Sequence, residues 1–465
     1  MGYKLQVASY KSMKQILKNK HGFTFIESLV LLFIFSITAV TFYSVFSLGT
    51  KHIIEAKNRL AAVSLANQKM EIIRNLNYNS IGTLGGIPNG SIDPDEYETV
   101  NTRNFHILTD IKYCDDPFDG IQGETPNDTI PNDYKIAKIT VKWGEETDSQ
   151  QVYLVATFAP PGIETSAGGG TLRINIIDSG AIGIAGANIH LHNAGTGVDL
   201  NTVTDSTGSV LFPGTPAGSD YEIDVSKNEY ESVSTLAVSP ASPYNPVTDE
   251  HASVIADALN VKSIIIDLLS DINISTVDPL NNAVGDTTFK LTGGRILGTK
   301  VSDGEPGYNY EQDLTADSSG EKSISNVSPG MYEFILRDIS DTNYTFIKMD
   351  PGDDTSSNKF TLSPGIALDV KAIIADKSVN SLLVSVKDNN GSVIEGASAR
   401  LKNDDLGYDI TLTTDKYGKA YFPDASGPLQ NDTYDLTVSA TGFNSDYSAN
   451  AISGLVEKDI VLTAT

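Results

Sequence analysis

The chain has 465 residues, 40% hydrophobic and 20% charged, which indicates a folded protein of about three domains. Lys and Arg number 33 against 59 Asp and Glu, and the net charge of −26 argues against a nucleic-acid partner. The single cysteine, Cys114, excludes a disulfide framework within the chain and a cysteine-based zinc site. The sequence contains no HExxH or GxxxxGK[ST] motif, and we expect no enzymatic activity.

The N-terminal region combines a basic segment with an apolar one. Residues 1–22 contain five lysines and no acidic residue, and residues 28–50 contain no charge. At about 1.5 Å per helical residue the apolar run spans roughly 34 Å, enough to cross a bilayer. The run is too long for a conventional signal peptide and lacks a small-x-small cleavage site. We therefore expect a membrane helix, with the rest of the chain on the extracytoplasmic side.

A short motif lies between these two segments. The residues His21-Gly22-Phe23-Thr24-Phe25-Ile26-Glu27 resemble the cleavage and methylation motif of type IV prepilins and pseudopilins. In that family a prepilin peptidase cuts after the glycine and methylates the new N-terminal residue, and the glutamate pairs with the amine of a neighbouring subunit. The resemblance implies cleavage between Gly22 and Phe23, N-methylation of Phe23, and a role for Glu27 in assembly and axial register. The alternative is that Glu27 lies at the headgroup level and reaches water.

The helix is expected to continue beyond the membrane segment. Apolar residues recur at spacings of three and four up to residue 76, and glycines follow from Gly82. The resemblance to prepilins implies that residues 1–22 are a leader and that residues 23–80 form the transmembrane and assembly helix. Residues 81–160 contain β-rich stretches at 134–144 and 151–159 joined by a predicted hairpin loop. This helix with a small antiparallel sheet resembles the globular part of minor pilins.

One acidic loop is a candidate cation site. Asp115, Asp116 and Asp119 lie within five residues and offer the oxygen ligands that Ca²⁺ takes. The loop lacks the DxDxDG core and the later glutamate of an EF-hand, and a solvated Asp-rich turn is the favoured interpretation. No cofactor is expected otherwise.

The remainder of the chain repeats itself. After a Gly-rich linker at 161–170, residues 171–262 and 377–465 share matching positions 210 apart, from Leu172 and Leu382 to Pro213 and Pro423. A divergent repeat occupies residues 263–376. Short alternating strands separated by Asp and Gly turns predict antiparallel β-sandwiches of about 90 residues.

These repeats resemble the carboxypeptidase-regulatory-like, or transthyretin-like, sandwich. The resemblance implies a rigid extracellular module without catalysis of its own. Some related collagen-adhesin modules carry a Lys–Asn isopeptide bond, but Arg173 occupies the first strand where a lysine would help. His190 and His192 lie on one face of a predicted strand, and without an identifiable third ligand they indicate a half-exposed strand face.

The predicted fold is α+β, with a long N-terminal helix and small antiparallel sheet followed by tandem all-β sandwiches. The predicted function is that of a minor pilin or pseudopilin. Its partners would be prepilin peptidase, other pilin subunits, the membrane and a possible extracellular surface ligand. The alternative is a membrane-anchored surface adhesin that does not polymerise. A type IV pilus and a type II secretion pseudopilus remain equally open.

Overall fold

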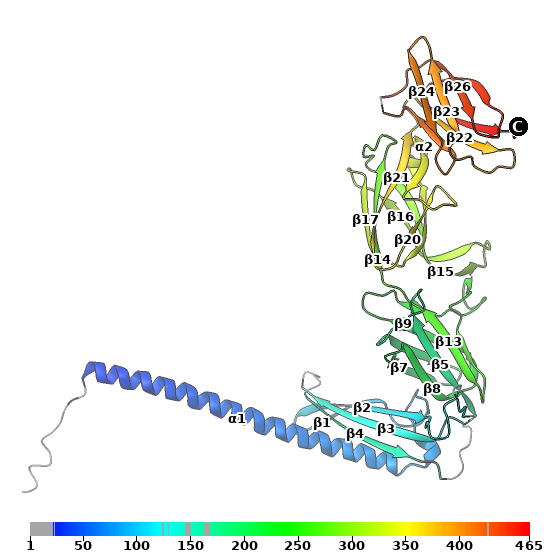
Figure 1. Cartoon of the computed structure of the whole chain (residues 1–465). Coiled ribbons are helices and arrows are strands. Elements are labelled where there is room, and N and C mark those ends of the chain that lie inside the picture. Colours follow the sequence, from blue (N-terminus) through cyan, green and yellow to red (C-terminus); the bar gives the residue numbers. More distant parts are fainter. Residues whose placement is uncertain are drawn as a thin grey trace, which may run out of the picture. The chain divides into compact units, whose positions relative to one another are not determined.

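The computed structural model describes residues 22, 24–122, 125–128, 130–144, 150–161, 168–425 and 427–465. One long helix is followed by strands in several sheets, which confirms the predicted fold class (Figure 1). The chain divides into two compact units. The first contains the long helix with residues 93–110 and 137–157, and the second contains residues 78–92, 111–136 and the chain from 158 onward.

The long helix α1 spans Phe25–Arg74. Its first half is exposed, and it contains an 18-residue window with a mean hydropathy of 2.3, enough to cross a membrane by length and composition. Several hydroxyl groups in this half donate to carbonyl oxygens four residues earlier, as from Ser36 to Leu32 at 2.7 Å and from Thr41 to Ile37 at 2.8 Å. These bonds satisfy the hydroxyls within the helix itself. The helix ends at Arg74, before the predicted end at residue 80, because Asn75 caps it and a separate 3₁₀ turn follows at Tyr78–Ser80.

The second half of α1 packs on a four-stranded sheet (Figure 1). Its strands, in spatial order, are β1 (Asp95–Val100), β2 (Arg103–Cys114), β3 (Tyr134–Trp143) and β4 (Gln151–Phe158). Alternate residues of β3 are buried, as its period-two pattern predicts. The indole Nε1 of Trp143 donates to both carboxylate oxygens of Glu55 on α1, at 3.0 and 3.2 Å. The predicted hairpin loop after β3 lies mostly in residues 145–149, outside the described residues.

Two segments assigned to the pilin-like part from sequence belong to the second compact unit. Residues 78–92 and 111–136 pack with the first sandwich. Ile87 is buried in its core, and the Asp199 backbone N–H donates to the Gly85 carbonyl at 2.7 Å. The predicted boundaries of 81–160 therefore do not describe one compact body, because apolar side chains of these loops are buried against the sandwich.

One lysine in this region is buried. Lys135 is only 1% exposed, and its ammonium donates to the carbonyls of Tyr78 at 2.8 Å and Ile81 at 2.7 Å. The rings of Tyr78 and Tyr113 lie 4.6 and 5.1 Å from the ammonium. Burial penalises the charged form and lowers the pKa of Lys135 to about 8.

The first sandwich consists of two facing sheets around one apolar core. One sheet has the order β13-β5-β8, and the other has the order β10-β9-β6-β7 with β12 beside β9. The strands are β5 (Gly169–Ile177), β6 (Asn188–Asn193), β7 (Val198–Val203), β8 (Ser209–Pro216), β9 (Gly218–Ser226), β10 (Val233–Ser234), β12 (Ala252–Val254) and β13 (Leu259–Ile265).

The second and third sandwiches have their own cores. The second contains β11 (Tyr244–Asn245), β14 (Ser270–Val277), β15 (Thr288–Lys300), β16 (Pro306–Thr315), β17 (Glu321–Val327), β18 (Gly330–Leu336), α2 (Asp338–Asn343), β19 (Tyr344–Asp350), β20 (Lys359–Leu362) and β21 (Ala367–Asp376). The third contains β22 (Ser381–Asp388), β23 (Ser398–Asn403), β24 (Tyr408–Thr413), β25 (Lys419–Phe422), β26 (Thr433–Ser439), β27 (Asp446–Ala451) and β28 (Leu455–Leu462).

The internal repetition read from the sequence is present in the structure. Strands β6 and β23 match at a shift of 210 residues, and so do β7 and β24. All three sandwiches share the Asp-x-x-Gly turn, in which the glycine N–H donates to the aspartate carbonyl: Gly208 to Asp205, Gly320 to Asp317 and Gly418 to Asp415. Each also buries one tyrosine, namely Tyr221, Tyr332 or Tyr434.

The sequence predicts purely antiparallel sandwiches, and the structure differs from that prediction. In each one the first strand pairs in parallel with the last: β5 with β13, β14 with β21, and β22 with β28. Side-chain alternation has the same period in parallel and antiparallel strands, so it cannot reveal this closure. Two expected boundaries are also crossed, because β13 continues past residue 262 and β5 begins at Gly169 inside the predicted linker.

Buried contacts join the first sandwich to the second. Strand β11 comes from the segment between β10 and β12 but pairs with β15 of the second sandwich. From the second sandwich, Arg295 of β15 donates to Asp249 through Nε and a terminal nitrogen, at 2.8 and 2.9 Å. It also donates to Glu231 at 2.9 Å and to the Ile265 carbonyl at 2.7 Å. The two carboxylate side chains are each 5% exposed.

Candidate functional site

The sequence-predicted processing residues lie at the start of α1. Gly22 is exposed, and Glu27 lies in the first turn of the helix. Thr24 is the N-cap: its hydroxyl accepts from the Glu27 N–H at 3.3 Å, and its own N–H donates to a Glu27 carboxylate oxygen at 3.4 Å. Phe23, the predicted methylation site, lies outside the described residues.

This capping box gives Glu27 a second role that the sequence analysis missed. The pattern Thr24-x-x-Glu27 is a recognised helix-start signature and was visible in the sequence. A carboxylate in the first turn also faces the positive end of the helix dipole, typically worth about 0.3–1 kcal/mol. In the single chain the carboxylate of Glu27 is therefore already engaged locally.

The acidic loop after β2 is organised by its own backbone. Asp115 accepts from the Gln122 N–H at 3.0 Å, and Asp116 accepts from the Phe118 N–H at 3.1 Å. Asp119 lies in the same turn. Among the described residues no group of three or more His, Cys, Asp or Glu side chains is placed to hold a metal ion. The loop's contacts favour the turn interpretation over the Ca²⁺ interpretation.

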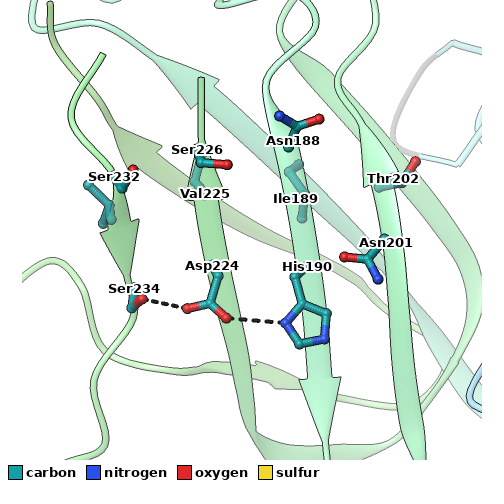
Figure 2. A pocket seen from close by; sticks show the side chains of 11 residues that line it. Asn188, Ile189, His190, Asn201, Thr202, Asp224, Val225, Ser226, Ser232 and Ser234 are labelled. Carbon is teal, nitrogen blue, oxygen red and sulfur yellow. Dashed lines mark hydrogen bonds and ion pairs between the residues drawn. The ribbon is translucent and has the colours of Figure 1, made fainter. Parts of the chain in front are cut away.

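A shallow groove of about 380 Å³ lies on the first sandwich, across β10, β9, β6 and β7 (Figure 2). At its centre His190 lies between two carboxylates: its Nε2 is 2.8 Å from Asp199, and its Nδ1 is 3.2 Å from Asp224. Ser234 donates to the other oxygen of Asp224. The hydrogen bond to Asp199 is the main reason why the pKa of His190 is raised above its ordinary value.

His190 and His192 both lie on the half-exposed face of β6, as predicted. His192 Nδ1 lies 3.9 Å from Asp199 and does not line the groove. Sequence reasoning found the two histidines but missed the groove and both aspartates, since these come from β7 and β9. Only strand register brings them together, and the spacing of residues in one strand carries no signal for that.

Comparison with known proteins agrees with part of the sequence analysis. Residues 171–249 match the family described as the carboxypeptidase regulatory-like domain, which confirms that resemblance for the first repeat. None of the curated proteins matches the chain.

Several solved structures match the chain at low identity and low TM-score. The Bacillus anthracis TIE protein is 12% identical with a TM-score of 0.19, and the match covers 80% of this chain and 73% of that one. A streptococcal ancillary pilin is 12% identical with a TM-score of 0.19, covering 64% of this chain and 99% of its own. BcpA, the major pilin subunit of Bacillus cereus, is 12% identical with a TM-score of 0.16, covering 64% and 100%.

Proposed function

We propose that the protein is a structural subunit of a type IV pilus-like filament, a minor pilin or pseudopilin that displays three β-sandwiches outside the cell. The observation that carries the proposal is the continuous helix Phe25–Arg74. It starts at the Gly22–Glu27 motif, its first half is apolar and exposed, and one face of its second half is buried against a small sheet. An apolar helix of this kind needs a membrane or other helices around it.

The proposal assigns each N-terminal residue a role. Prepilin peptidase removes residues 1–22 and methylates Phe23, after the apolar helix has held the chain in the membrane. The new α-amine of Phe23 then lies close to a Glu27 carboxylate of an adjacent subunit, and their pairing sets the axial register. The sandwiches contribute display and contact, and the proposal assigns them no catalytic activity.

The decisive experiment separates the charge of Glu27 from its capping role. Glu27→Gln removes the charge but keeps an acceptor for the Thr24 N–H, since glutamine also serves in a capping box. Thr24→Ala removes the cap and keeps the charge. Removing one member of a buried ion pair typically costs about 3–5 kcal/mol, so Glu27→Gln should be absent from sheared filaments. Thr24→Ala should lose only about 0.5–2 kcal/mol of helix stability and still be incorporated.

Two further measurements complete this test. Mass spectrometry should find the mature wild-type chain and Glu27→Gln both beginning at N-methylated Phe23, while Gly22→Val should keep its leader. If Glu27→Gln enters sheared filaments as well as the wild type, the assembly role is wrong. If the wild type and Glu27→Gln both stay in the membrane fraction, the membrane-anchored adhesin becomes the better interpretation, because an anchor alone gains from losing a charge.

A further inference from the structure

We infer that the groove on the first sandwich is a binding site for an uncharged, hydroxyl-rich ligand, such as a segment of a neutral polysaccharide. The inference starts from a row of outward-facing residues that strand register aligns across four strands. Ser234 of β10 is opposite Asp224 of β9, Asp224 is opposite His190 of β6, and His190 is opposite Asn201 of β7 (Figure 2). The row runs along the groove of about 380 Å³, within the usual range for small-ligand sites.

Each charged side chain in this row already has a partner within the protein. The two oxygens of Asp224 interact with Ser234 and with His190, and the other ring nitrogen of His190 is held by Asp199. A cationic ligand would have to displace the imidazole from these carboxylates. The ligand therefore meets mainly uncharged groups.

The uncharged groups that can form hydrogen bonds are amides and hydroxyls, and they lie beside the apolar Ile189, Val225 and Val233. Exposed side chains of Asn188, Asn201, Ser226 and Ser232 surround the central pair (Figure 2). Each of them can both donate and accept hydrogen bonds. A ligand that presents many groups of the same dual character, as sugar hydroxyls do, matches this lining better than a charged one. The shallow form of the groove suits a segment of a chain rather than an enclosed small molecule.

The third sandwich serves as an internal comparison, because it repeats the same row with different side chains. Arg400 occupies the position of His190, and Tyr447 occupies the position of Ser234. Arg400 forms a two-pronged ion pair with Asp409, whose position matches Asp199, and the Tyr447 hydroxyl donates to Asp435 at 2.6 Å. Strand β27 is also six residues long where β10 has two. Large side chains thus occupy this face in the third sandwich, whereas smaller side chains leave it open in the first.

This comparison supplies a variant that should fill the groove without disturbing the fold. His190→Arg combined with Ser234→Tyr installs residues that the third sandwich accommodates in the same register. Asp199 is retained as the partner for the new arginine. The matched control is His192→Lys, which installs the third sandwich's Lys402 on the same strand but outside the groove.

The test is affinity electrophoresis and calorimetry of the full chain in a detergent without a sugar headgroup, with dextran, mannan, galactan and hexalysine as probes. We expect at least one neutral polysaccharide to bind the wild type and the His192→Lys control. We expect binding to the double variant to fall at least tenfold. We also expect the wild-type affinity to stay within twofold between 0.05 and 0.5 M salt, because an uncharged ligand is not screened.

Three results would overturn the inference: no neutral polysaccharide binds, the double variant binds as well as the wild type, or hexalysine binds better than the three polysaccharides. If the double variant loses its far-UV spectrum, Asn188→Ala with Ser226→Ala replaces it, since both side chains are exposed. That pair must then weaken binding for the inference to stand. The assay uses unassembled protein, so a negative result leaves the filament proposal untouched.

Discussion

His190 differs from its counterpart in the third sandwich in one chemical respect. Arg400 keeps its charge at every accessible pH, and its pairing with Asp409 raises its pKa further. His190 occupies the same position with the equivalent aspartate, Asp199, as its partner, and this hydrogen bond raises the pKa of the imidazole above its ordinary value. The charge at this position therefore depends on pH in the first sandwich, where it is His190, and not in the third, where it is Arg400.

The raised pKa of His190 can be measured by proton NMR of the imidazole ring. We expect a midpoint above 6.5 in the wild type and a lower one in Asp199→Asn, because the hydrogen bond to Asp199 is the largest cause of the shift. Asp409→Asn, the equivalent change in the third sandwich, should leave the His190 curve unchanged. Because the folded pKa is raised, the stabilisation is complete below pH 6.5 and is lost as pH rises through the folded value. An unchanged midpoint in Asp199→Asn would contradict this account.

At the scale of elements, Lys135 of strand β3 connects this strand to the segment after α1 through hydrogen bonds. Its ammonium reaches the carbonyls of Tyr78 and Ile81 from the interior. A lysine with a folded pKa of about 8 is neutral at a pH where the unfolded chain, with an ordinary value of 10.5, is still protonated. Unfolding then takes up a proton, so raising the pH from 8 to 10 favours the folded state.

We therefore expect the stability of this region to rise with pH relative to Lys135→Met. The difference between the two proteins should grow by at most about 1.4 kcal/mol per pH unit between pH 8 and 10. Denaturation followed by Trp143 fluorescence is suitable, since Trp143 belongs to the same strand. Lys135→Met should be less stable than the wild type, because the two carbonyls lose their donor. Only the slope of the stability difference against pH tests the titration of Lys135. Parallel curves for the two proteins would show that Lys135 does not titrate in this range.

Much of the element pattern could be predicted from the sequence. The long helix follows from an apolar run and three-four spacing, and the strands of the first and third sandwiches follow from alternation and Asp-x-x-Gly turns. The parallel closure between β5 and β13 could not be predicted, since it joins residues such as Leu172 and Asn260 that are far apart in the chain. The burial of Ile87 in the first sandwich was also hidden, because a loop residue shows no period.

The groove lies beyond sequence reasoning for a related reason. Its lining comes from residues 188–190, 201–202, 224–226 and 232–234, and each stretch taken alone is an ordinary polar strand face. The difference between the two sandwiches appears only when the repeats are aligned. His190 and Ser234 then occupy the positions of Arg400 and Tyr447. The capping box at Thr24 and Glu27, in contrast, was readable from the sequence.

At the scale of the whole molecule, the junction between the first two sandwiches depends on Arg295. Its guanidinium forms ion pairs with both Glu231 and Asp249, which are nearly inaccessible to water. An arginine suits this place because its planar fork can bind several oxygens at once. Strand β11 reinforces the junction from the other direction by extending the sheet of β15.

Arg295→Ala should weaken this junction strongly, because it leaves two buried carboxylates without their cation. We expect a loss of about 3–5 kcal/mol. In calorimetry the first and second sandwiches should unfold together in the wild type and in separate transitions in the variant. Arg337→Ala is the control, since its ion pair with Asp313 is 3.7 Å long and exposed, and it should cost about 0–1 kcal/mol. Similar effects of the two substitutions would show that Arg295 does not couple the sandwiches.

The parallel pairing of first and last strands has a mechanical consequence. The chain enters the first sandwich at the start of β5 and leaves at the end of β13, and these points lie at opposite ends of the pair. Tension between them slides the two strands past each other, so the hydrogen bonds from Thr171–Leu259 to Ile177–Ile265 resist the load together rather than one at a time. The pair β14 and β21 repeats this arrangement in the second sandwich. Tension along the chain therefore loads the hydrogen bonds of a parallel strand pair in shear, first in one of these two sandwiches and then in the other.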